Sequence, residues 1–164
     1  MWDKYQKTLN SETSFSGVGL HSGVKVDVTL VPGNSNSGIV FKRTDLEKDN
    51  EIVANFKNVS SAKLCTKIEN NHGVSVSTIE HLLAAFYVCG IDNIIVNLNG
   101  PEVPIMDGSA KEFVKIINEV GLKTLEGKRK FVRVKKSVEL KKEDGRTISV
   151  KPSSQTFDVK FTLN

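Results

Sequence analysis

The sequence contains little of what several protein classes require. It has only two cysteines, Cys65 and Cys89, among 164 residues, and they form no C-x-x-C pair. A disulfide framework or a cysteine-rich structural zinc site is therefore not expected, and we predict that both are small buried apolar residues. The chain has three histidines and no H-E-x-x-H or H-x-x-H pattern, so spacing alone indicates no complete zinc site.

Long apolar runs are also missing. No stretch of about 18 uncharged apolar residues is present, so no transmembrane segment is expected. The first residues, Met1 to Lys7, carry charges with no apolar run behind them, which argues against a secretory signal and favours a cytoplasmic location. The apolar content of 38% and the charged content of 26% are typical of a globular protein.

The net charge of +4 is unevenly distributed, because basic residues are in excess only after Leu122. A basic tail can bind nucleic acid, anionic lipid or a phosphorylated ligand, although such charges are more often a solvated strand face. The aromatic residues of this tail, Phe131, Phe157 and Phe161, follow strand alternation and are predicted to be core residues. We therefore expect no nucleic-acid partner, and a non-enzymatic module that binds RNA or another polyanion is the alternative hypothesis.

Periodicity predicts the elements of the first part of the chain. Alternation of apolar and polar residues indicates strands at 24–31, 39–41 and 94–98. Apolar residues at i, i+3, i+4 and i+7 predict helices over 79–86 and 113–120. Glycines at 90 and 121 are the expected ends of these helices.

The pattern changes after Gly121. Residues 127–130 are predicted to be a linker, and 131–140 and 146–150 to be strands joined by a hairpin turn at Asp144-Gly145. Residues 157–163 alternate once more, and the sequence stops in mid-pattern at Asn164. We predict an α+β fold, with one complete domain at 1–126 whose sheet packs against two helices. Residues 127–164 would then be a linker and the truncated start of a second α+β domain.

The pair Glu80–His81 is the most interesting candidate site. Each predicted helix begins with Ser-x-x-Glu, at 77–80 and at 109–112, which is the capping-box pattern. From the pattern alone, Glu80 is a helix cap and His81 a polar residue of the first turn. The chemistry also permits another interpretation, because a glutamate can act as general base beside a metal and a neutral imidazole binds zinc.

Three further polar residues lie in glycine-rich or polar turns. His21 follows a G-x-G sequence that precedes a strand, which excludes a dinucleotide-binding or phosphate-binding loop. His72 lies in the polar run 69–73, typical of an exposed loop. Asp107 is a turn residue before the second helix, although it could also be catalytic.

Five motifs in order carry a resemblance to one family. They are S-G-V-G-L-H-S-G at 16–23, R-T-D-L at 43–46, S-T-I-E-H-L at 77–82, G-I-D-N-I at 90–94 and P-E-V-P-I-M-D-G-S at 101–109. The chain resembles the N-terminal half of the zinc-dependent UDP-3-O-acyl-N-acetylglucosamine deacetylases of lipid A biosynthesis. The resemblance covers essentially the whole chain.

The resemblance implies two similar α+β domains with the active site between them. It makes His81 a zinc ligand and Glu80 the base that activates water for hydrolysis of the N-acetyl group, with release of acetate. The substrate would be a nucleotide-sugar glycolipid. Leu64 and Cys65 match a segment near the metal cleft, and Arg146 matches a phosphate contact, so these are expected substrate-binding residues. His21 and Asp107 are further cleft candidates.

The chain also departs from this family. The remaining zinc ligands, a histidine and an aspartate in an H-x-x-x-D motif, belong to the second domain, and that motif is absent here. The zinc site is therefore incomplete, and the missing C-terminal domain is the expected partner. We predict that this chain alone is inactive or nearly so. A third hypothesis is self-association through sheet edges that the truncated second domain exposes.

Overall fold

The computed structural model describes residues 3–154 and 158–162. The chain divides into two compact units, Met1–Arg129 and Lys130–Asn164, each of which is described by itself. Among the described residues, no helix is long and apolar enough to cross a membrane.

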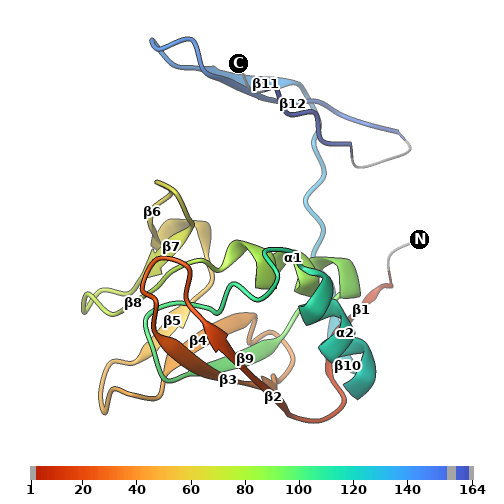
Figure 1. Cartoon of the computed structure of the whole chain (residues 1–164). Helices are drawn as coiled ribbons and strands as arrows, with labels where there is room; N and C mark the ends of the chain where they lie inside the picture. Colours follow the sequence, from red (N-terminus) through yellow and green to blue (C-terminus); the bar gives the residue numbers. More distant parts are fainter. Residues whose placement is uncertain (1–2, 155–157, 163–164) are drawn as a thin grey trace. The chain divides into compact units, whose positions relative to one another are not determined.

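The centre of the first unit is a five-stranded sheet in the order β2-β3-β9-β4-β5 (Figure 1). Its strands are β2 (Thr13–Val18), β3 (Lys25–Pro32), β9 (Ile94–Leu98), β4 (Ile39–Arg43) and β5 (Glu51–Val53). β4 runs parallel to β9, and all other neighbours are antiparallel. The three strands predicted in this part of the chain are confirmed as β3, β4 and β9.

Two helices, α1 (Glu80–Cys89) and α2 (Lys111–Val120), lie side by side in this unit (Figure 1). Both predicted helices are confirmed, and so are their ends, because Gly90 and Gly121 adopt φ of 76° and 77° at the C-caps. The buried core joins helix residues Phe86 and Phe113 to the alternate apolar residues of β3 and β9. The predicted α+β class, with a sheet packed against two helices, is confirmed.

The predicted capping box is wrong at α1, where the N-cap is Ile79 and no side chain caps the helix. At α2 the N-cap is Ala110, but the Ser109 hydroxyl accepts a hydrogen bond from the N–H of Lys111 at 3.1 Å, as the serine of the predicted box would. The cause at α1 is that Thr78 has a left-handed φ of 57°, so the helix cannot start at Ser77. Ser77 instead pairs through its backbone with the segment around Glu102.

Smaller sheets, which periodicity did not predict, flank the main one. β1 (Tyr5–Leu9) pairs with β10 (Leu122–Lys128), and a second sheet contains β6 (Val59–Ser61), β7 (Lys67–Glu69) and β8 (Ser75–Val76), preceded by the 3-10 helix η1 (Phe56–Asn58). Residues 127–128, predicted as linker, thus belong to a strand. Arg129 also binds Asp92 in a two-pronged ion pair, with N···O distances of 2.7 and 2.6 Å.

The second unit contains one hairpin, β11 (Val138–Lys141) and β12 (Thr147–Val150), whose turn has Gly145 at φ 85°. The hairpin prediction is confirmed, but 131–137 is not strand, nor is 158–162. Phe157 and Leu163 of the last predicted strand lie outside the described residues. Phe131 and Phe161 are 60% and 82% exposed, so their prediction as core residues is wrong. That this unit begins a second domain stays a prediction.

Candidate active site

Glu80 and His81 are the first two residues of α1, and both side chains are half-buried. Glu80 Oε2 accepts a hydrogen bond from the backbone N–H of Thr66, with an N···O distance of 3.1 Å. The Glu80 carboxylate therefore fixes the loop before β7 rather than capping its own helix. This contact brings the segment 64–66 against the start of α1.

A strained turn at Thr78 directs the chain into α1. Thr78 is only 2% exposed and holds a φ of 57°, a conformation that is unusual for a β-branched residue and costs about 1–3 kcal/mol. The Thr78 hydroxyl donates to Glu102 Oε1 at 2.8 Å. Such a conformation persists only where surrounding contacts hold it, and here a buried carboxylate is one of them.

Glu102 is 1% exposed, and hydrogen bonds satisfy both of its carboxylate oxygens. The backbone N–H of His21 donates to Oε1 at 3.0 Å, and that of Ser22 donates to Oε2 at 2.7 Å. Burial raises the pKa of Glu102, but the hydrogen bonds from His21, Ser22 and Thr78 lower it more, to about 2. Glu102 is thus a charged group that joins two loops.

Two glycines allow the loop at 16–23 to approach the segment 101–109. A Cβ at Gly19 would overlap the carboxylate of Glu102, and one at Gly17 would lie 2.8 Å from Cβ of Pro104. These positions therefore need glycine for close packing, which explains the G-V-G sequence better than any ligand loop does.

A third motif reaches the same place from β4. Arg43 donates from Nη1 to the carbonyl oxygen of Ser75, two residues before Ser77, at 3.0 Å. Asp45 holds the Arg43 guanidinium from the other side, with an Nη2···Oδ2 distance of 2.6 Å, and this hydrogen bond lowers the pKa of Asp45. Four of the five sequence motifs thus meet at the segment that enters α1, while the fifth, at 90–94, lies at the helix's other end.

The remaining predicted site residues are less closely connected. Leu64 is 85% exposed with a φ of 67°, and its neighbour Cys65 is half-buried. The prediction of buried cysteines is therefore wrong for Cys65, and Cys89 is also only half-buried, although both are free thiols as expected. Arg146 is exposed in the second unit and bound to Asp144 at 2.7 Å.

His21 and Asp107 are surface residues. The imidazole of His21 is exposed, and the residue binds Glu102 only through its backbone N–H. Asp107 accepts hydrogen bonds from the N–H and the hydroxyl of Ser109, which lower the pKa of its exposed carboxyl. Its prediction as a turn residue is confirmed.

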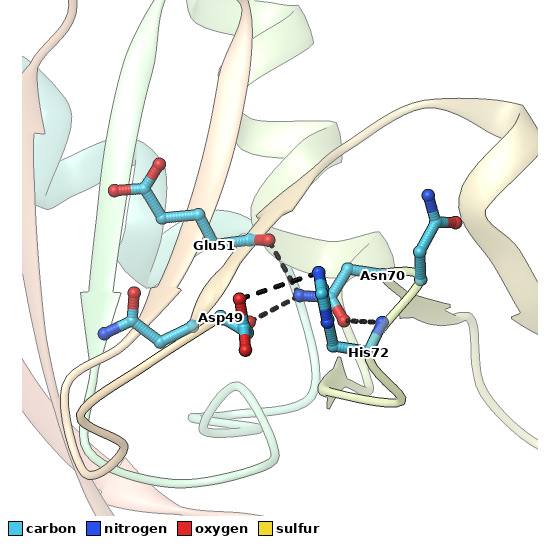
Figure 2. Close-up of a pocket in the computed structure, with 6 residues that line it drawn as sticks. Asp49, Glu51, Asn70 and His72 are labelled. Atoms are coloured by element: carbon cyan, nitrogen blue, oxygen red, sulfur yellow. Dashed lines mark hydrogen bonds and ion pairs between the residues drawn. The ribbon is translucent and has the colours of Figure 1, made fainter.

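His72 lines a shallow polar pocket away from α1 (Figure 2). The imidazole faces Asp49 at 3.5 Å, and the Asn70 amide donates to the carbonyl oxygens of Asp49 and Glu51 at 2.6 and 3.0 Å. These contacts join two surface loops. The exposed loop predicted at 69–73 is confirmed for 71–73, whereas Glu69 ends β7 and Asn70 is half-buried. The pocket holds neither Glu80 nor His81.

The donors at the start of α1 are one imidazole and one carboxylate. Over residues 3–154 and 158–162, no group of three or more His, Cys, Asp or Glu side chains could hold a metal ion. Imidazole and carboxylate are donors that zinc accepts, but a catalytic zinc site usually has three protein ligands. The described residues near the start of α1 could therefore supply part of a zinc site and not a complete one.

Pattern reasoning missed Thr78 and Glu102. The signal for Glu102 was present, since it is a single charged residue inside the apolar run P-E-V-P-I. A charge in such a run is expected to be buried with partners. Nothing in the sequence indicated the left-handed backbone of Thr78.

Comparisons with known proteins agree on one family. Residues 6–164 match the family model described as LpxC: UDP-3-O-acyl N-acetylglycosamine deacetylase. The chain is 49% identical over 160 residues to the UDP-3-O-acyl-N-acetylglucosamine deacetylase of Geotalea uraniireducens. The aligned region covers 96% of the chain and 52% of that protein. It is 46% identical to the Wigglesworthia glossinidia brevipalpis protein of that name, over 97% of the chain and 52% of the relative. The chain thus spans about half the length of the curated relatives it matches.

Proposed function

This chain belongs to the LpxC family of UDP-3-O-acyl N-acetylglycosamine deacetylases, and from that premise we propose that it is the N-terminal half of such an enzyme. The enzyme hydrolyses the N-acetyl group of a UDP-3-O-acyl-N-acetylglucosamine, releases acetate and acts in the cytoplasm in lipid A biosynthesis. The observation that carries the proposal is the placement of Glu80 and His81, adjacent at the start of α1, where four of the motifs meet.

His81 is the residue of this chain that would hold zinc, and the C-terminal half would supply the other ligands. Bound zinc would act as a Lewis acid and lower the pKa of a coordinated water. Glu80 takes the proton from the attacking water as general base. The hydrogen bond from Thr66 uses Glu80 Oε2 and so orients Oε1 as the proton acceptor.

Other residues of the chain would contact the substrate. Leu64 and Cys65 precede Thr66, whose backbone binds Glu80, and the exposed Leu64 side chain would offer the substrate an apolar surface. Arg146 binds a phosphate of the nucleotide in exchange for its exposed partner Asp144. His21 and Asp107, both exposed on the segments that meet at Glu102, would be outer contacts of the substrate.

The test is made in the full-length enzyme, which is this chain followed by its C-terminal half, from the continued reading frame or from the Geotalea relative by fusion. Glu80→Gln is expected to lower kcat by about 10²- to 10⁴-fold with zinc retained. His81→Ala is expected to lower zinc content as well. Acetate release and zinc per chain are measured.

Glu112→Gln is the matched control, because Glu112 occupies the same Ser-x-x-Glu position at the start of α2 and is exposed. Its kcat and zinc content should equal those of the unsubstituted enzyme. Unchanged acetate release in Glu80→Gln would contradict the role of base, and unchanged zinc in His81→Ala would contradict the role of ligand.

The polyanion-binding alternative has one observation in its favour, since Phe131 and Phe161 are exposed in the basic tail. The family match weighs against it, because that match extends through this tail to residue 164. A gel-shift titration with RNA at two salt concentrations distinguishes the two functions. Affinity that falls steeply with salt would support the alternative.

A further inference from the structure

The direction of α1 depends on the three residues that precede it. The N–H of Ser77 donates to the carbonyl oxygen of Pro101, and the N–H of Val103 donates to the carbonyl oxygen of Ser77, both at 3.0 Å. Thr78 then turns left-handed and Ile79 is the N-cap. Since no side chain caps the helix, the turn itself decides where Glu80 and His81 point.

Glu102 holds this turn from the side. Its backbone pairs with Ser77, and its carboxylate accepts the Thr78 hydroxyl at 2.8 Å. The N–H groups of His21 and Ser22 fix the carboxylate from the opposite loop. The side chain is therefore clamped between two backbone segments and cannot move without releasing Thr78.

A carboxylate suits this position and an amide does not. Three donors point at the two oxygens of Glu102, so a glutamine would direct its own NH₂ group at one of them. Gly19 packs so closely on this carboxylate that a Cβ at position 19 would overlap it. The contacts thus need two acceptor oxygens.

We propose that Glu102 is a positioning residue of the active site, which sets the directions of Glu80 and His81 by fixing the left-handed turn at Thr78. This inference rests on the proposed function, because Glu80 and His81 must be the catalytic base and the zinc ligand. Glu102 is buried, so its proposed role is to position other residues and not to react itself. It acts through Thr78. A shift of the Thr78 turn by about 1 Å would displace Glu80 and His81 and lower the rate of the reaction.

The test uses the full-length enzyme and a double-mutant cycle. Thr78→Val removes the hydrogen bond between hydroxyl and carboxylate, and Glu102→Gln puts an NH₂ group against one of the donors that hold the carboxylate in place. Each should lower kcat by about 10- to 100-fold with KM little changed. Because both act through one contact, the double variant should be no slower than the slower single variant. Thr78→Ser keeps the hydroxyl and should recover kcat to within about three-fold of the unsubstituted enzyme.

Asn93→Ala is the matched control. Asn93 is also buried and also joins two segments, through hydrogen bonds with Gly38 and Gln6 at 3.0 Å each, but it lies beyond the other end of α1. This variant should lower Tm and leave kcat unchanged. If kcat fell as much in Asn93→Ala as in Thr78→Val, the loss would reflect general destabilisation. Glu102 would then have no specific positioning role, and the proposal would be overturned.

Other outcomes would also overturn it. Additive effects in the cycle, or a Thr78→Val enzyme with unchanged kcat, would show that Glu102 does not act through the turn. If Glu102→Gln does not fold, the kcat values of Thr78→Val and Thr78→Ser decide whether the turn at Thr78 positions the catalytic pair. A failure of the proposed function would look different from a failure of this inference. If Glu80 were not the base, the Glu80→Gln enzyme would be as active as the unsubstituted enzyme.

Discussion

The two units of this chain use the same period-two pattern and reach different structures. In the first, alternation along β3 and β9 buries one face of a sheet under two helices, and Phe86 and Phe113 complete the core. In the second, alternation along β11 and β12 gives a hairpin, and none of the described residues 130–154 and 158–162 is buried. A hairpin joins residues that are close in sequence, whereas a core needs elements from distant parts of the chain.

This difference explains why the proposed active site lies in the first unit and is incomplete there. Buried contacts can hold a strained residue such as Thr78, and among the described residues they occur in the first unit. Within the described part of the second unit no other element packs on the hairpin, and the relatives are about twice as long as the chain. We expect the C-terminal half to supply such an element together with the missing zinc ligands.

The strongest contrast is between this chain alone and the full-length enzyme. We expect the 164-residue chain to deacetylate the nucleotide sugar at least about 10³-fold more slowly, because one imidazole and one carboxylate hold zinc weakly. Acetate release measured at equal chain and zinc concentrations tests this. Activity close to that of the full-length enzyme would show that the first unit contains a complete site.

A substitution in the buried core should strongly destabilise the first unit. Phe86→Ala removes a fully buried ring between α1 and the sheet, so it should lower the free energy of unfolding by about 3–5 kcal/mol. Urea titration followed by circular dichroism measures the loss. A change of less than about 1 kcal/mol would mean that the first unit is not held by this core.

Acid should weaken the first unit through Glu102. Its pKa is about 2 in the folded chain against an ordinary value of 4.5, so the ionised form stabilises the fold above pH 4.5 and this contribution is lost as the pH falls toward 2. Its full size is on the order of 3 kcal/mol.

The measurement is the unfolding free energy from pH 7 to pH 3, for the unsubstituted chain and for Glu102→Gln. The difference between the two should be largest at pH 7 and shrink below pH 4.5. Asn93→Ala removes no titratable group. Its loss of unfolding free energy relative to the unsubstituted chain should therefore not shrink below pH 4.5. If the difference in unfolding free energy were constant with pH, the lowered pKa of Glu102 in the folded chain would be contradicted.

The boundary between the units can be placed by truncation. A chain that ends after Lys130 should keep the stability of the first unit, whereas one that ends after Glu126 loses the end of β10 and the Arg129–Asp92 ion pair. We expect the shorter chain to be less stable by about 2 kcal/mol. Equal thermal midpoints would favour the boundary at 126 that the sequence predicted.

The smallest effect is expected in the hairpin. Ile148 is 70% exposed, so Ile148→Ala should change the unfolding free energy of this chain by no more than about 0.5 kcal/mol. In the full-length enzyme the same substitution should cost about 1 kcal/mol or more if the second half covers the hairpin. An equally small effect in both proteins would mean that this face stays exposed.

Local signals predicted the elements that local interactions decide. Period-two and period-3.6 patterns predicted β3, β4, β9 and both helices, and glycine predicted the left-handed helix ends. The Ser-x-x-Glu pattern at 77–80 failed because a capping box requires a free helix start, and the backbone of Ser77 was already paired with residues around Glu102. A distant strand pairing thus overrode a local preference.

The sequence by itself determined the α+β class, the hairpin turn at Gly145 and, through five ordered motifs, the family and the candidate pair Glu80–His81. Only the tertiary structure decided how this pair is held. Glu80 binds Thr66 instead of capping its helix, and Glu102 accepts hydrogen bonds from His21 and Ser22 of one loop and from Thr78 of another segment. The physical reason is that periodicity records which face a residue presents, whereas a buried carboxylate finds its donors only after the chain has folded.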